Sequence, residues 1–218
     1  MKLTEIVKRA LVPLVAAVTL VASPTTARAD FYDGVRGPST AQVHYTANFE
    51  KNTTNHALAL KYFGEHIFGI GVLTTDTAQR TGGFSGLGYL LENFDRVKAL
   101  PVVGYNLSAD SKKGTAVGVL QATTFLDSKG TFLLDPRYVL AVPAHGQQSH
   151  TPQHTIGLTV SVGNERIRFG PDVNYQPKSN FTGGGLLRYD IDAERHSSWV
   201  EVGIGQKGNV QVQFMGNF

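Results

Sequence analysis

Charged and amide side chains recur at alternate positions in the last third of the chain, a spacing that could gather them in one polar interior. They are Arg166, Arg168, Asp172, Arg188, Glu201, Gln211 and Gln213. Residues two apart in a β-strand share a face. If 197–206 pairs with 209–218, Glu201 faces Gln213, with Arg188 in diagonal reach. Two interpretations stay open: rings of charge set selectivity in pores, whereas paired charges can simply fill a small barrel.

Three histidines, His145, His150 and His154, lie close together in a polar stretch of the sequence. Imidazole nitrogens bind transition metals, so the three residues are a weak candidate for a metal site. No carboxylate lies between Pro143 and Asn164, however, and the stretch has the composition of a solvated loop. We therefore expect neither a metal nor a cofactor.

His196 and Ser198 have the residue types of an acyl hydrolase, a base and a nucleophile, at a spacing that puts both on one strand face. Asp190, Asp192 and Glu194 precede them, but none has a spacing that would orient the histidine. The pair is a weak catalytic candidate. The sequence favours a protein that is not an enzyme, with a hydrolase as the alternative.

The elements that position these residues are β-strands. At the C-terminus, Val210, Val212 and Phe214 alternate with Gln211 and Gln213, which is the period of a strand with one apolar face. Similar alternation, and no sustained helical period, continues through the chain from residue 41. The chain is therefore expected to be all-β and antiparallel.

The sequence predicts twelve strands. They are 41–49, 57–63, 66–74, 84–91, 99–107, 114–126, 130–141, 153–163, 165–175, 181–190, 197–206 and 209–218. An irregular stretch at 57–74 would leave ten or eight. If the last strand ends in the periplasm, the longest loop, 143–152, lies outside the cell, and 92–98 and 191–196 are periplasmic turns.

The polar face of these strands favours a membrane barrel over a soluble one. It consists of Thr, Gly, Ser, Gln and isolated charges, whereas the water-facing side of a soluble strand is usually rich in Lys and Glu. Glycines on that face, such as Gly157, Gly184 and Gly203, would make room for larger neighbours inside a closed barrel. The alternative is a soluble periplasmic, lipocalin-like barrel with an interior ligand pocket.

The N-terminus predicts export through the Sec pathway. Residues 1–29 combine a basic start, the apolar run 10–22 and Ala27 and Ala29 before Asp30, which is typical of a cleaved signal peptide. The expected organisation is a signal peptide (1–29), a periplasmic lead-in (30–40) and a barrel domain (41–218).

Cleavage changes the charge balance that the whole chain presents. It removes four basic residues and one acidic residue from totals of 20 and 17, which leaves 16 of each. The pI of about 9.1 therefore says nothing about partners of the mature chain, and nucleic acid is excluded.

The charged fraction of 17% is below the roughly 25% of soluble domains. Without cysteine there is no disulfide, thiolate metal site or lipoprotein anchor.

Together, the signal peptide and the closing sequence VQVQFMGNF resemble bacterial outer-membrane β-barrel proteins as a class. The resemblance implies a Gram-negative outer membrane, contact with its lipids and lipopolysaccharide, and recognition by the barrel-assembly machinery through the strand that ends at Phe218. It also implies a small pore for hydrophilic solutes or a structural barrel. Within the same class, lipid A deacylases with a strand-borne His and Ser pair are the enzymatic alternative.

Overall fold

The computed structural model describes most of the chain from residue 41 onward. The described residues are 41–64, 66–78, 80–94, 97–107, 113–127, 130–144, 146, 151–164, 166–177, 180–191, 198–206 and 208–217. The expected signal peptide (1–29) and lead-in (30–40) lie outside them. Within these ranges no helix is long and apolar enough to cross a membrane.

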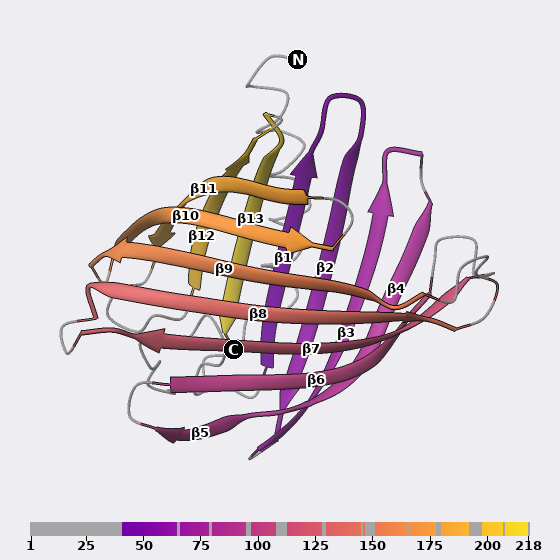
Figure 1. The fold of residues 1–218 in the computed structure, drawn as a ribbon, viewed down its shortest axis with the longest axis horizontal. Helices are drawn as coiled ribbons and strands as arrows, with labels where there is room; N and C mark the ends of the chain where they lie inside the picture. The colour runs from indigo at the N-terminus through magenta and orange to yellow at the C-terminus, as the bar shows by residue number, and fades with distance from the viewer. Residues whose placement is uncertain are drawn as a thin grey trace.

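The described residues form one antiparallel sheet in which strands adjacent in sequence are also adjacent in space (Figure 1). The strands are β1 (Ala41–Phe49), β2 (Thr54–Phe63), β3 (Ile67–Asp76), β4 (Thr81–Tyr89), β5 (Leu91–Phe94), β6 (Val97–Leu107), β7 (Gly114–Phe125), β8 (Phe132–Pro143), β9 (Gln153–Gly163), β10 (Ile167–Gln176), β11 (Asn180–Asp190), β12 (Ser198–Gly205) and β13 (Val210–Asn217).

The sheet closes into a barrel of twelve strands. β1 pairs with β13, and β4 pairs with β6, so the described strands leave no open edge. β4 and β5 both pair with β6 and are separated only at Leu90, after which the register shifts. They are therefore two parts of one wall strand. The all-β class and the count of twelve predicted from the sequence are confirmed.

Two details differ from the sequence-based expectation. The stretch 92–98 was expected to be a turn, but only 95–96 lie between β5 and β6. That expectation is wrong because the chain re-pairs beyond Leu90 and extends the wall. The stretch 57–74 is regular: β2 and β3 pair without interruption from Asn55 opposite Asp76 to Phe63 opposite Phe68.

The barrel has two ends, which we name by what they contain. The terminal end is where β1 begins and β13 ends, and it also holds the turns 64–66, 126–131 and 164–166. The loop end holds the long connection 144–152 and the β12–β13 turn, where Gly208 adopts a φ of 71° that favours glycine. The end of β8 and the start of β9 lie opposite the end of β13, as alternation predicted, and the position of 143–152 outside the cell stays a prediction.

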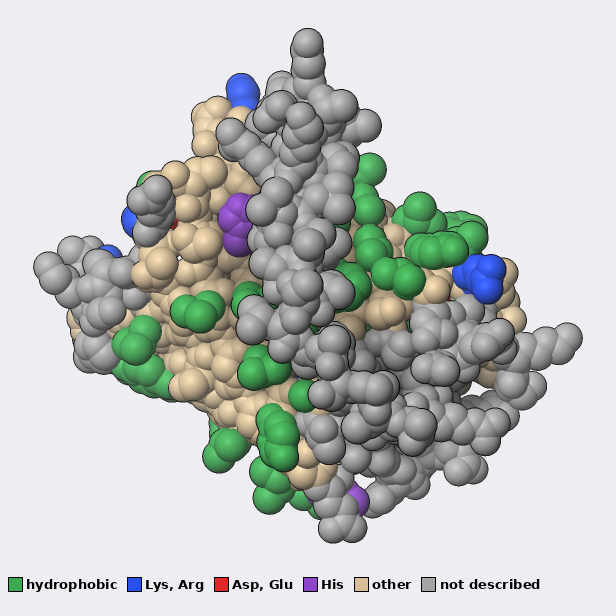
Figure 2. Space-filling model, turned by 180° about the vertical axis from the view of Figure 1, so that it is seen from behind, with side chains coloured by type: hydrophobic (Ala, Val, Ile, Leu, Met, Phe, Trp, Pro, Cys, Tyr) green, Lys and Arg blue, Asp and Glu red, His purple; other side chains and the backbone are tan. Residues whose placement is uncertain are grey.

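The outer face of the barrel is apolar. Large exposed hydrophobic side chains occur on every strand from β2 to β12, with Leu73 at 66% exposure and Val103 at 69%. Figure 2 shows groups of these side chains with few charges between them. An outer face with exposed apolar side chains on so many strands would aggregate in water, whereas it matches the hydrocarbon of a bilayer.

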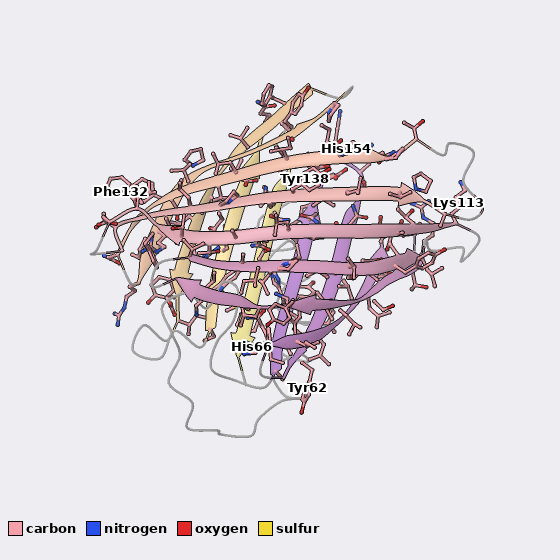
Figure 3. All side chains as sticks on the ribbon, turned by 60° about the horizontal axis from the view of Figure 1, so that its bottom comes forward. Tyr62, His66, Lys113, Phe132, Tyr138 and His154 are labelled. Carbon is pink, nitrogen blue, oxygen red and sulfur yellow. The ribbon has the colours of Figure 1, made fainter. Side chains whose placement is uncertain are left out.

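Aromatic side chains lie on the outer face near both ends of the barrel. Tyr62 and Phe132 are exposed near the terminal end (Figure 3). Tyr189 is exposed at the same end, near the end of β11. Tyr175 and Phe181 are near the loop end, where their ring centroids are 4.9 Å apart. Two such girdles are typical of the interfaces where a membrane barrel leaves the bilayer.

The membrane-facing assignment predicts that the cost of a charge depends on depth. Leu120, exposed at the middle of β7, and Leu107, exposed at the loop end of β6, both lie on the outer face. We expect Leu120→Arg to lower the free energy of unfolding in phospholipid vesicles by about 2–4 kcal/mol, and Leu107→Arg by about 0–1 kcal/mol. Denaturant titration measures both. Equal, small losses would mean that this face meets water.

Candidate functional site: a charged cavity inside the barrel

The barrel encloses a cavity of about 650 Å³. Its walls come from the inward faces of β1, β2 and β7 to β13. Lining residues reach both ends: Arg166 and Asp190 lie at the terminal end, and Gln206 and Asn209 at the loop end. The cavity therefore extends along the length of the barrel.

All seven residues of the predicted inward cluster line this cavity. They are Arg166, Arg168, Asp172, Arg188, Glu201, Gln211 and Gln213. The expected pairing of Glu201 with Gln213 is observed in the β12–β13 register. Arg188 lies directly opposite Glu201 on β11, closer than the diagonal position expected from the sequence. Whether these residues set selectivity stays a prediction.

The first cluster of contacts centres on Glu201, whose carboxylate is held from two sides. Arg188 Nε and Nη2 lie 2.9 and 2.8 Å from Glu201 Oε2. Gln213 Nε2 donates to Glu201 Oε1 at 3.2 Å. The Arg188 guanidinium also lies over the Trp199 ring, 4.4 Å from its centroid, and His44 Nε2 lies 2.8 Å from Gln213 Oε1. A buried charge needs such pairing because desolvation is costly.

The second cluster centres on Arg137, which reaches across β9 to β10. Arg137 Nη2 lies 2.7 Å from Asp172 Oδ1 and donates to Asn174 Oδ1 at 2.7 Å. Thr159 donates to the same Asp172 oxygen at 2.6 Å. The path of the Arg137 side chain over β9 depends on Gly157, because a Cβ there would lie 2.4 Å from Arg137 Nε. The expectation that Gly157 makes room for a larger neighbour is confirmed, and the neighbour is Arg137.

Sequence reasoning missed Arg137 and Asp135, although a signal was present. The two residues are two positions apart in β8 and share its inward face, where both line the cavity. Pro136 lies between them, and because proline cannot donate to a ladder it weakens the strand pattern of the sequence there. The structure places Pro136 opposite Leu158, on the outer face.

Arg168 and Arg188 are directly opposite each other on β10 and β11, where like charges repel. Their guanidinium groups turn to different partners. Arg168 donates to the carbonyl oxygen of Gly130 and lies over the Phe125 ring, 5.2 Å from its centroid. The turn that carries Gly130 is fixed by Asp127. The backbone N–H of Phe132 donates to the Asp127 carboxylate and lowers its pKa.

The other side of the interior is apolar. Phe63, Phe68, Leu90 and Leu100 form a buried cluster, with Ile70 and Val102 packed against it. The ring of Phe68 lies where a Cβ on Gly88 would be, at 2.2 Å. The interior thus contains an apolar part between β2 and β6 near the terminal end and a polar cavity lined by β1, β2 and β7 to β13.

The other sequence candidates lie away from the cavity or outside the described residues. His145, His150 and His196 belong to the latter group. His154 is on the outer face at the loop end, where its Nδ1 lies 2.7 Å from the hydroxyl of Tyr138 (Figure 3). Ser198 begins β12 on its outer face. Among the described residues, no group of three or more His, Cys, Asp or Glu is arranged to hold a metal.

Comparison with known proteins shows which solved structures share this fold. No protein-family model and no curated protein matches the chain. Among solved structures, the KdgM porin in complex with disordered oligogalacturonate superposes with a TM-score of 0.62 at 12% identity, over 81% of this chain and 99% of that one. The NanC porin superposes with a TM-score of 0.59 at 10% identity, over 82% and 98%. The chain has the fold of outer-membrane barrels.

The lumenal network predicts energetic coupling between Arg137 and Asp172, whose side chains are 30% and 31% exposed. In a double-mutant cycle with Arg137→Ala and Asp172→Ala, we expect a coupling free energy in the upper part of the roughly 0.5–3 kcal/mol range for contacting residues. The i,i+4 pair Arg80–Asp76 at the β3–β4 turn is the control, with side chains 69% and 12% accessible. It should give about 0.2–1 kcal/mol. Equal coupling in the two cycles would contradict the structural role of the lumenal network.

Proposed function

We propose that this protein is an outer-membrane channel through which small hydrophilic solutes diffuse. One observation carries the proposal: a polar cavity reaches both ends of a closed barrel whose outer face is apolar. Barrels of eight strands are filled by their own side chains, and those of 16 to 18 hold wide aqueous channels. A twelve-strand barrel lies between these sizes, which suits a narrow passage.

The same features support a place in the Gram-negative outer membrane. The exposed apolar face and aromatic girdles fit contact with outer-membrane lipids and lipopolysaccharide. The expected signal peptide would direct the chain to Sec export. The closing strand β13, with Phe218 after it, would serve as the signal for the barrel-assembly machinery. These assignments would put the terminal end in the periplasm and the connection 144–152 outside the cell.

The structure gives no support to the two alternatives. A lipocalin-like barrel would bind its ligand in an apolar interior and expose polar side chains, whereas the polar side chains here face the cavity. A lipid-modifying hydrolase would need a base and an acid near Ser198. Among the described residues, the carboxylates that line the cavity lie on the opposite face of the wall from Ser198.

The channel predicts that bulk on the lumenal face blocks it, while equal bulk outside does not. Gly203 lines the cavity, and a Cβ there would make only ordinary contact with Gln211. Gly118 is on the outer face of β7 with open space around it. We expect Gly203→Phe to lower single-channel conductance in planar bilayers severalfold and Gly118→Phe to leave it unchanged.

Liposome swelling with small sugars provides a second readout of the same comparison. Both variants should retain heat-modifiable migration on SDS gels, which reports the folded barrel. Refolded wild-type protein that gives neither conductance nor swelling would overturn the channel and leave a purely structural barrel.

A further inference from the structure

The charges that line the cavity balance. Its cationic residues are Lys61, Arg137, Arg166, Arg168 and Arg188. Its carboxylates are Glu50, Asp135, Asp172, Asp190 and Glu201. Five positive and five negative groups give a formal net charge of zero. A pore that concentrates one sign of ion does so with rings of one sign of charge. The described lining carries both signs in equal number.

Four of these ten groups form two ion pairs, in which the opposite charges cancel each other's fields at short range. Arg137 and Asp172 are joined at 2.7 Å, and Arg188 and Glu201 at 2.8 Å. A solute in the cavity therefore meets ion pairs, whose potential falls off more steeply than that of single charges. Neither polyanions nor polycations gain a net electrostatic attraction from such a wall.

The remaining polar lining is rich in carboxamides, three of which form a connected track. From Glu201, the track passes through Gln213 Nε2, which donates to Gln211 Oε1 at 2.7 Å. Gln211 Nε2 in turn donates to Asn48 Oδ1 at 2.8 Å. Each carboxamide carries both donors and acceptors. This dual capacity matches hydroxyl groups, which also donate and accept.

We propose that the solutes admitted by this channel are uncharged and hydroxyl-rich, such as short neutral oligosaccharides. This inference rests on the proposed channel function. The apolar cluster of Phe63, Phe68, Leu90 and Leu100 fills the interior between β2 and β6 toward the terminal end, and none of its residues lines the cavity. Sequential hydroxyl groups would exchange hydrogen bonds along Glu201, Gln213, Gln211 and Asn48.

The first test measures ion and sugar permeation through the full-length protein in planar bilayers and liposomes. In a KCl gradient we expect a potassium to chloride permeability ratio within about a factor of two of unity, as for an aqueous pore without a ring of one charge sign. Liposome swelling should be at least as fast with maltotriose as with trigalacturonate. Marked anion selectivity with faster entry of trigalacturonate would overturn the inference while leaving the channel intact. Absence of conductance and swelling would overturn the channel itself.

A second test removes one charge at a time from the balanced lining. Glu201→Gln leaves one excess positive charge and should favour chloride, whereas Arg188→Gln leaves one excess negative charge and should favour potassium. The expected change in the permeability ratio is roughly fivefold in opposite directions, the effect of one unit charge close to an ion in water. Asp76→Asn, in an ion pair at the β3–β4 turn and outside the cavity lining, is the control and should change nothing. If both lumenal variants are equally anion-selective, the charges that line the cavity do not balance and the inference fails.

Discussion

The absence of water from the bilayer core is the constraint on which the rest of the structure depends. Every backbone N–H and C=O in hydrocarbon must pair within the protein, because an unpaired group costs several kcal/mol. For strands, the only solution is closure. Here it is achieved where β1 pairs with β13 from Gln42 opposite Asn217 to Phe49 opposite Val210. The break at Leu90 is tolerated because β4 and β5 both pair with β6.

Closure together with the two-residue period of a strand decides where polar side chains can go. Since the outer positions face lipid, charges in the spanning segments collect inside, where each must find a partner. Arg188 finds Glu201 in the next strand. Arg137 finds Asp172 two strands away, and this longer reach is available only because Gly157 leaves the wall between them bare. The Arg137–Asp172 ion pair therefore depends on the glycine at position 157.

The sequence was most informative where the two faces of a strand differ most. In β13, valines and glutamines alternate, so the strand, its inward face and the pairing of Glu201 with Gln213 could all be predicted. Strands β2 and β3 were harder to recognise because their inward side chains are also apolar, as Phe63 and Phe68 are, which blurs the alternation. The partnership of Arg137 with Asp172 could not be predicted. The Arg137 side chain reaches past β9 to β10. Alternation predicts on which face of the sheet a side chain lies, but not how far it extends.

The blurred alternation of the first strands has a structural consequence of its own. These strands are apolar on both faces. The outer face meets lipid, and the inner face contributes an apolar cluster to the interior of the barrel. Dispersion contacts and burial hold that cluster together without polar partners. It fills the lumen between β2 and β6 toward the terminal end, and none of its residues lines the polar cavity, where the ion pairs and carboxamides lie. Asymmetry of the wall thus narrows a twelve-strand interior and requires whatever occupies the cavity to contact its charged and amide-bearing residues.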